Sequence, residues 1–243
     1  MNHTITWHGH ANFQLTAGDV SVIIDPFFEG NAFATVDPES IEKLDIILVT
    51  HDHGDHVGHA VELAKRTGAM VGAVVGTAGK LVEQGVPQEQ IINGIGFNIG
   101  GSVTVKGVTI TMTQAFHSSD TSVPVGYILT FPDGYTAYHA GDTGIFSSME
   151  LWGKLYAIDL AMLPIGGVFT MDPRQAAMAC WMLDCDAVAP MHWGTFPVLE
   201  QSTDEFERLL KQEAPDCAML RLEPGKPTEV KAASGDTCGC NDE

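Results

Sequence analysis

The sequence has few basic residues for its length. Its 243 residues include 12 Lys and Arg against 31 Asp and Glu, so the formal net charge at pH 7 is -19. Nucleic-acid binding depends mainly on Lys and Arg contacts to phosphate, so this balance argues against a DNA or RNA partner. A membrane partner is disfavoured for the same reason, because anionic lipid surfaces attract basic segments.

Long apolar runs and a targeting segment are also missing. No stretch approaches the roughly 18 apolar residues of a membrane-spanning helix, and residues 1–7 lack the basic and apolar regions of a secretory signal. The cysteines are odd in number and scattered: Cys180, Cys185, Cys217, Cys238 and Cys240. We therefore expect a cytoplasmic protein with reduced thiols. The Cys-Gly-Cys near the end could hold a soft metal, although idle thiols in a frayed terminus are the simpler interpretation.

Three common motifs are absent as well. There is no Gly-x-Ser-x-Gly nucleophile elbow, no Walker A phosphate loop and no tandem pair of Cys-x-x-Cys motifs. A serine hydrolase, a P-loop enzyme and a structural zinc module are therefore each poorly supported. The sequence is instead rich in histidine and glycine, with 10 and 26 residues.

The order of apolar runs predicts an α/β protein. Short strand-like runs alternate with helical spacing, for example over 57–66, and turn signals at 106–107 and 132–134 indicate an antiparallel middle. Neither a linker nor a repeat interrupts this pattern, so we expect one domain over residues 1–243, with 232–243 as a flexible tail. The expected architecture is two mixed β-sheets packed together with helices outside.

The most informative segment is Thr50-His51-Asp52-His53-Gly54-Asp55-His56. It follows the continuous apolar run 46–49, which is typical of a strand covered on both faces. His51 and His53 are two residues apart, so on an extended segment they project to the same side. After a turn at Gly54, Asp55 and His56 begin a helix and can face the same point. Imidazole and carboxylate groups at this density indicate a metal site for an ion such as Zn, Fe, Ni or Cu.

Three later residues could complete such a site, because each follows a predicted strand. His117 comes after 109–116, Asp142 after 135–139 and His192 after 187–189. Taken singly, each is more often a loop or core residue than a ligand. Their recurrence at strand ends is what favours a shared site.

Together these residues resemble the metallo-β-lactamase superfamily of dinuclear metal hydrolases. The order is His-x-His-x-Asp-His, a lone His, a Gly-Asp-Thr and a later His, from Trp7 to about Pro197. Segments 7–10, 24–27 and 138–143 are most similar to the small stand-alone branch of metal-dependent hydrolases and ascorbate-6-phosphate lactonase-like enzymes. The resemblance implies a four-layer αβ/βα sandwich with the metals at one edge of the two sheets.

The resemblance also implies ligand roles. By matching position, His51, His53 and His117 would hold one metal ion. Asp55, His56 and His192 would hold the other, and Asp142 would bridge the two. Asp55 would in addition be catalytic, orienting the water and shuttling its proton. The cofactors would be two divalent cations, zinc first, with manganese, nickel or iron as options.

Three further residues are weaker candidates. Asp25 matches an acidic position of the family and would accept a ring N–H from a ligand histidine. His10 could line the substrate cleft or make only a structural hydrogen bond. His139 could support the metal site or be a buried histidine bonded to backbone.

This set of ligands predicts a hydrolase in which a metal-bridging hydroxide attacks a small ester, lactone, thioester or phosphodiester. The cationic centre would allow a small anionic substrate even in an acidic protein, and the sequence leaves a homo-oligomer open. Two alternatives remain: an iron-dependent redox enzyme on the same scaffold, and a non-catalytic metal-binding or sensor protein.

Overall fold

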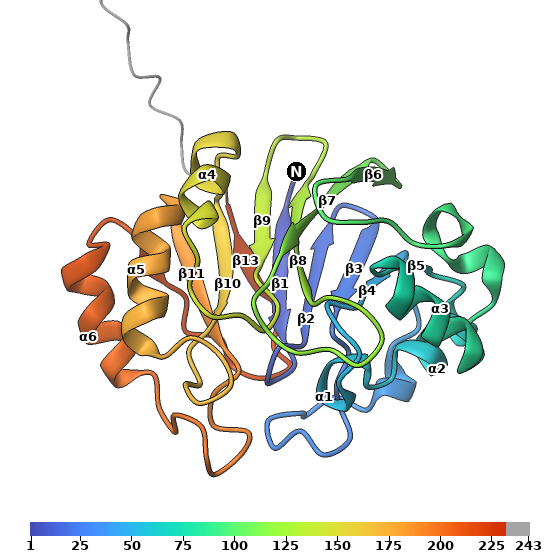
Figure 1. Ribbon diagram of the computed structural model, residues 1–243, viewed down its shortest axis with the longest axis horizontal. Coiled ribbons are helices and arrows are strands. Elements are labelled where there is room, and N and C mark those ends of the chain that lie inside the picture. Colours follow the sequence, from blue (N-terminus) through green and yellow to red (C-terminus); the bar gives the residue numbers. More distant parts are fainter. Residues whose placement is uncertain (232–243) are drawn as a thin grey trace, which may run out of the picture.

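The computed structural model describes residues 1–231. The expected flexible tail over 232–243, with Cys238 and Cys240, therefore lies outside the described residues. Two β-sheets pack face to face, and helices cover the outer face of each sheet (Figure 1). This confirms the expected sandwich of two mixed sheets.

The first sheet is built mainly from the N-terminal third of the chain. Its strands are β1 (His3–Trp7), β2 (Phe13–Ala17), β3 (Val20–Ile24), β4 (Ile46–Leu48), β5 (Met70–Gly72) and β13 (Thr228–Val230). The spatial order is β13-β1-β2-β3-β4-β5. β3, β4 and β5 run parallel, whereas β13, β1, β2 and β3 are antiparallel neighbours. The carboxyl ends of β3 and β4 therefore lie at one edge.

The second sheet takes the rest of the chain in nearly sequential order. Its strands are β6 (Ser102–Val105), β7 (Val108–Gln114), β8 (Val125–Thr130), β9 (Thr136–His139), β10 (Leu160–Pro164), β11 (Ala187–Met191) and β12 (Ala218–Met219). β6 to β9 are antiparallel, as the two turn signals predict, and β9 to β12 are parallel.

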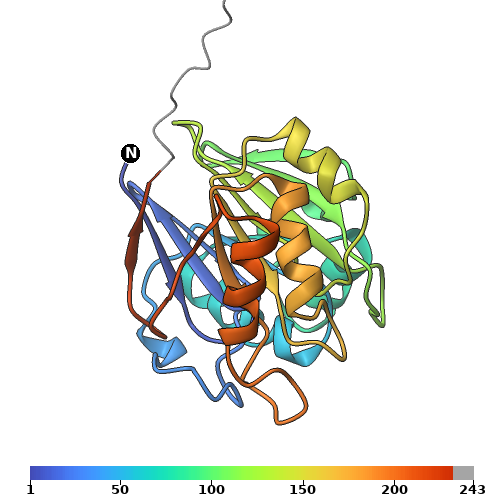
Figure 2. The same ribbon diagram turned by 90° about the vertical axis from the view of Figure 1, so that its left-hand side faces the viewer.

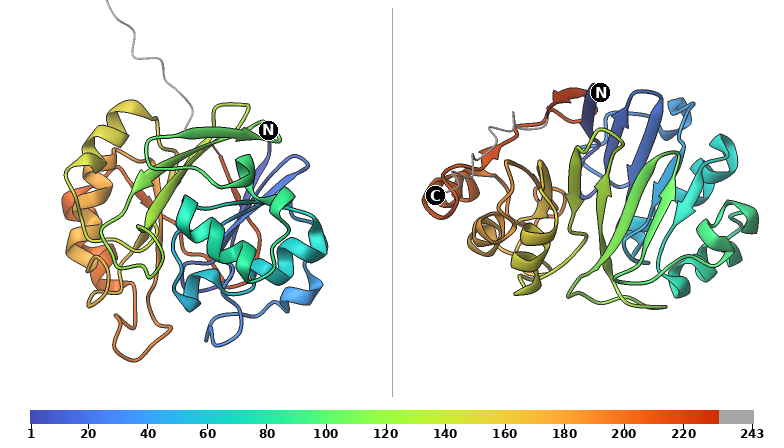
Figure 3. Two further views of the ribbon diagram at one scale, coloured as in Figure 1. Left: turned by 45° about the vertical axis from the view of Figure 1, so that its right-hand side comes forward. Right: turned by 90° about the horizontal axis from the view of Figure 1, so that it is seen from above.

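The helices form the two outer layers. On the first sheet lie α1 (Gly54–Val57), α2 (Ala60–Thr67) and α3 (Val75–Glu83); on the second lie α4 (Ser148–Leu155), α5 (Pro173–Leu183) and α6 (Asp204–Glu213). Figure 2 shows α5 and α6 side by side over the second sheet, and Figure 3 shows the layers from above. Short 3-10 turns occur at Pro38–Ser40, Gln88–Gln90 and Ile92–Gly94. Within residues 1–231, no helix has the length and apolarity needed to cross a membrane.

The apolar core has three parts that match these layers. Between the sheets, side chains such as Phe13, Leu15 and Tyr127 are almost completely buried. One outer cluster, including Leu63, joins the first sheet to α2 and α3. The other, including Phe206, joins the second sheet to α4, α5 and α6. Burial of this apolar surface is the main force that holds the four layers together.

The helix expected over 57–66 is in fact two helices, and the reason is a close backbone approach. Gly58 has a φ of 44°, and a Cβ at this position would lie 2.4 Å from the carbonyl oxygen of Pro26. The next backbone N–H, that of His59, donates to the same oxygen over 2.8 Å. The loop after β3 thus breaks the helix and fixes α1 as a separate single turn.

Candidate metal centre

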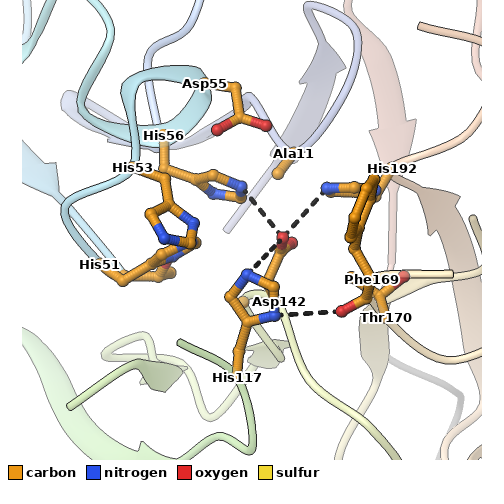
Figure 4. A network of polar contacts seen from close by, with 12 residues as sticks. Ala11, His51, His53, Asp55, His56, His117, Asp142, Phe169, Thr170 and His192 are labelled. Atoms are coloured by element: carbon orange, nitrogen blue, oxygen red, sulfur yellow. Dashed lines mark hydrogen bonds and ion pairs between the residues drawn. The ribbon is translucent and has the colours of Figure 1, made fainter. Parts of the chain in front are cut away.

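The seven candidate ligands converge at one edge of the sandwich, and they come from both sheets (Figure 4). The first sheet supplies four of them, on the loop after β4 and on α1: His51, His53, Asp55 and His56. The second sheet supplies three, each after a different strand: His117 after β7, Asp142 after β9 and His192 after β11. The carboxyl ends of parallel strands are a common position for binding sites in α/β proteins.

Asp142 lies at the centre of this arrangement. Its Oδ2 is 3.0 Å from Nε2 of His192, 3.4 Å from Nε2 of His56 and 3.6 Å from Nε2 of His117. The side chain is almost completely buried. One carboxylate oxygen therefore faces histidines that come from three separate segments of the chain.

The other donors fall into two groups of neighbouring atoms around Asp142. In one group, the donor atoms of His51, His53 and His117 lie within 4.8 Å of one another. In the other, Asp55, His56 and His192 meet the same criterion together with His10. The structure thus brings every candidate ligand into one cluster, in which a third group of His51, His56 and Asp142 joins the other two.

Asp25 orients one histidine of each group through hydrogen bonds. Its Oδ2 accepts hydrogen bonds from Nδ1 of His56 and from Oγ1 of Thr50, each over 2.7 Å. The Thr50 hydroxyl is in turn 3.0 Å from Nδ1 of His51. With their Nδ1 atoms held in this way, His51 and His56 turn Nε2 toward the centre. This is how ligand histidines are normally fixed, by a hydrogen bond on the nitrogen away from the metal.

His10 and His139 have different surroundings. His10 places Nε2 3.1 Å from Oδ2 of Asp55 and Nδ1 3.0 Å from Oγ1 of Thr195, so it contacts a candidate ligand directly. His139 instead bonds to backbone, with Nε2 2.9 Å from the Ala11 carbonyl and Nδ1 accepting from Gly141 N–H. It joins the turn that carries His10 to the loop that carries the central aspartate.

Burial and neighbouring charges shift the pKa values of several residues in the centre. Burial lowers the pKa of His51 to about 2, so its ring is neutral and a lone pair is available. Burial also acts against charge on His56, but Asp142 and Asp25 outweigh it and raise its pKa well above the usual value. For Asp142, burial favours the neutral acid, yet His56 and His192 hold its pKa well below the usual range. A proton on His56 thus supplies positive charge between two buried carboxylates.

The donor atoms fit divalent metal ions. Buried polar atoms normally have hydrogen-bond partners, but Oδ1 of Asp142 has none within residues 1–231, and Nε2 of His56 has only the 3.4 Å contact with Asp142 Oδ2. Both belong to the converging set. Imidazole nitrogens with carboxylate oxygens are a donor set that suits zinc and other transition-metal ions. The arrangement therefore has the unsatisfied atoms, the ligand chemistry and the negative charge that bound metal cations would complete.

A pocket of about 310 Å³ opens onto the centre. Phe169 and Phe196 form an aromatic part of its lining, beside metal-centre residues and Ser118. The carbonyl of Phe169 also lies 3.0 Å from Nδ1 of His117, so the loop before α5 helps to orient that histidine. Among the described residues that line this pocket, none is Lys or Arg.

Asp52 is a residue of the site that the sequence analysis did not single out. It lies between two candidate ligands, yet its buried carboxylate points to the loop after β7. Oδ1 accepts from Ser119 Oγ (2.7 Å) and Asp120 N (2.8 Å), and Oδ2 from Thr121 N (2.9 Å) and Thr121 Oγ1 (2.6 Å). Lys80 Nζ is 3.1 Å from Oδ2. Asp52 therefore anchors the segment that follows His117.

The backbone around the centre is strained. Of seven non-glycine residues with positive φ in residues 1–231, His10, Asp25 and His192 belong to the site, at 53°, 49° and 58°. Val168, beside the pocket residue Phe169, has a φ of 45° although it is β-branched. Such conformations cost on the order of 1–3 kcal/mol each and cluster at functional sites. No local sequence signal marks these positions.

Comparisons with known proteins agree with this geometry. A family model described as a β-lactamase superfamily domain matches residues 21–193. The chain is 61% identical over 240 residues to a metal-dependent hydrolase of Nitratidesulfovibrio vulgaris, covering 99% of this chain and 100% of the relative. A metal-dependent hydrolase of Methanopyrus kandleri is 42% identical over 234 residues, covering 93% of this chain and 99% of the relative.

A solved structure is also similar over nearly its whole length. The metallo hydrolase of the hyperthermophilic archaeon Ignicoccus hospitalis has a TM-score of 0.86 and 35% sequence identity, covering 95% of this chain and 99% of that chain. The family match and these relatives cover the two sheets and the converging histidines and aspartates. The chain therefore belongs to the metallo-β-lactamase superfamily, as a small stand-alone metal-dependent hydrolase.

Proposed function

We propose that this chain is a single-domain, dinuclear hydrolase of small carbonyl substrates: esters, lactones or thioesters. The observation that carries the proposal is the position of Asp142, whose Oδ2 faces His117 of one donor group and His56 and His192 of the other. A carboxylate so placed can bridge two ions. His51, His53 and His117 would hold the first ion; Asp55, His56 and His192 would hold the second. Five histidines in the set favour zinc over manganese.

Asp55 is the best-placed residue to orient a water molecule. Its side chain is 27% exposed and lines the pocket, whereas the other carboxylates of the centre are buried. Burial acts to raise its pKa, but the hydrogen bond from His10 and the charge of His56 hold it well below the usual value. It is therefore an ionised acceptor that can orient a water molecule at the pocket. Divalent ions in such a site supply a Lewis acid and lower the pKa of water.

The pocket favours a neutral substrate with an apolar part. Phe169 and Phe196 offer aromatic surface, and no lining side chain among the described residues supplies positive charge. A phosphodiester or another anionic substrate would depend on the ions alone for its charge complement. We therefore place esters, lactones and thioesters ahead of phosphodiesters as substrates.

Elemental analysis combined with a substrate screen tests this function. The protein loaded with zinc is expected to hold about two ions per chain and to cleave carbonyl substrates. His53→Ala should lose about one ion and at least a hundredfold in rate, while His59→Gln, outside both donor groups, should keep both. Fewer than one tightly bound ion, or unchanged hydrolysis in His53→Ala, would contradict the proposal. Iron with oxygen consumption would replace it with the redox alternative.

A further inference from the structure

Three cysteines that are far apart in the sequence meet behind the second sheet. Cys180 lies in the last turns of α5, Cys185 follows this helix, and Cys217 immediately precedes β12. Asp184, at the end of α5, adopts the left-handed conformation with φ 48° and turns the chain so that Cys185 comes back toward the helix. All three cysteines are buried and free.

The distances between their sulfur atoms match those of ligands that share one ion. The three sulfurs lie within 4.8 Å of one another, and those of Cys185 and Cys217 are 3.6 Å apart. Metal–sulfur bonds of about 2.3 Å place two sulfurs roughly 3.8 Å apart in tetrahedral geometry and roughly 4.0 Å apart in trigonal geometry. A disulfide would instead need a separation of about 2.05 Å. The observed spacing therefore needs little adjustment to hold an ion.

This cluster is separate from the histidine centre. Cys185 and Cys217 precede the amino ends of β11 and β12, which run parallel with Ala187 opposite Ala218. The histidine centre lies at the carboxyl ends, and His192 follows β11 by one residue. At about 3.3 Å per residue, the strand separates the two places by roughly 16 Å. The cysteines also belong to the apolar cluster outside the sheet, with Phe206 and Leu210.

The surroundings favour a positive ion bound by sulfur. Sγ of Cys185 lies 3.6 Å from Sγ of Cys217 and 3.9 Å from the backbone oxygen of Cys180, so the three cysteines already contact one another. Burial and the nearby carboxylates of Asp159 and Asp184 raise the pKa of Asp186, so this end of the sheet is rich in negative charge. The donor group contains sulfur alone, with neither imidazole nor carboxylate. Sulfur donors select soft ions, and zinc in structural sites normally takes four ligands.

We propose that Cys180, Cys185 and Cys217 form a second, all-sulfur metal site that binds one Cu(I) ion. The ion binds as Cu(I) and stays Cu(I), and the thiols that coordinate it release their protons to solvent. Affinity should therefore increase with pH. The ion would tie the end of α5 to the amino ends of β11 and β12, far from the hydrolytic pocket.

The experiment is a Cu(I) titration under nitrogen, on protein whose histidine centre is first filled with zinc. A Cys238→Ser/Cys240→Ser background removes the thiols of the tail. We expect one Cu(I) per chain, thiolate-to-copper absorption in the near ultraviolet, and a copper K-edge spectrum with about three sulfur neighbours. Cys217→Ser should lower the affinity at least tenfold and keep the hydrolytic rate. Met149→Leu, which removes a buried sulfur elsewhere in the same apolar cluster, should bind copper normally.

A second measurement uses the background protein without changes to the cluster. Cu(I) should slow alkylation of Cys185 and Cys217, as mapped by mass spectrometry, at least tenfold. The proposal is overturned by folded protein that binds no Cu(I), by binding that survives in Cys217→Ser, by a spectrum with only nitrogen or oxygen neighbours, or by a Cys185–Cys217 disulfide in protein purified under nitrogen. Hydrolysis is measured separately, so failure here leaves the proposed function standing.

Discussion

Replacement of Asp52 by asparagine tests whether a buried carboxylate holds the metal-site loops together. In the native chain Asp52 accepts four hydrogen bonds from residues 119–121 and pairs with Lys80. Asparagine keeps Oδ1 for the Ser119 hydroxyl and the Asp120 N–H. It places an amide NH₂ where Oδ2 now accepts from Thr121 and faces the lysine.

The expected loss follows from this count. Three hydrogen bonds to Oδ2 disappear, two from Thr121 and one from Lys80. The two from Thr121, at about 1.5 kcal/mol each, should lower the free energy of unfolding by about 3 kcal/mol, and the partly exposed lysine adds at most about 1 kcal/mol. The matched control is Asp120→Asn. This carboxylate is 78% exposed and 4.0 Å from the same lysine, so its loss should change the stability by less than about 0.5 kcal/mol.

The effect should also depend on pH in one direction. Burial acts to raise the pKa of Asp52, but hydrogen bonds from Thr121 and Ser119 hold it well below the usual range. A carboxyl with a lowered pKa in the folded state stabilises the fold above its unfolded pKa of about 3.9. That stabilisation is lost as the pH falls toward the folded pKa. The difference in the free energy of unfolding between the native protein and Asp52→Asn should be constant from about pH 5 to 8. It should decrease below about pH 4.

The assay is urea unfolding of the metal-free proteins, followed by circular dichroism, with ion binding measured in parallel. Ion affinity at the group containing His117 should fall in Asp52→Asn, because the loop after this histidine loses its anchor. A loss below about 1 kcal/mol, or an equal loss in Asp120→Asn, would refute the reasoning. It would mean that the loop is held by packing rather than by this carboxylate.

Three further predictions concern the centre itself. Asp25→Asn should lower the affinity for both ions about tenfold to a hundredfold, as measured by competition with a chelator. The reason is that this carboxylate orients His56 directly and His51 through Thr50. A loss of affinity for one ion alone would contradict this shared role. His10→Gln should lower kcat but keep the ion content, because His10 contacts Asp55, and a missing ion would make His10 a ligand instead. Phe169→Ala should raise KM about fivefold for an aryl ester, because about 1 kcal/mol of apolar contact is lost. The KM for a methyl ester should not change. Equal changes in KM for the two esters would exclude an aromatic subsite.

The sequence predicts the centre well where local pattern is enough. The apolar run of β4 marks a buried strand, and the ligand motif begins as soon as this strand ends. The later candidate ligands also follow predicted strands, and this recurrence, together with the family resemblance, indicates a shared site at one edge of the sheets. Gly68 ends α2 in the left-handed conformation, as its position after a helical pattern indicates.

The features that sequence reasoning missed depend on contacts between distant segments. Gly58 breaks a helix only because the carbonyl of Pro26 lies against it. Three partners of Asp52 are 67 to 69 residues away and Lys80 is 28 residues away, and no local pattern indicates them. The helix α4 has no clear amphipathic pattern in the sequence, because two of its leucines, Leu151 and Leu155, face solvent. The cysteines meet only because two parallel strands begin side by side.

The origin of the ligands in both sheets has a consequence for the lifetime of the protein. In the proposed centre, each ion position would combine residues after β4 with a residue from the second sheet, so a bound ion would be a removable cross-link between the layers. At a free ion concentration of a hundred times Kd, each site adds about 2.7 kcal/mol to the free energy of unfolding. Starvation for metal would therefore raise the population of opened chains, which proteases degrade. The supply of metal would then set how much of the enzyme a cell retains, as well as how fast it works.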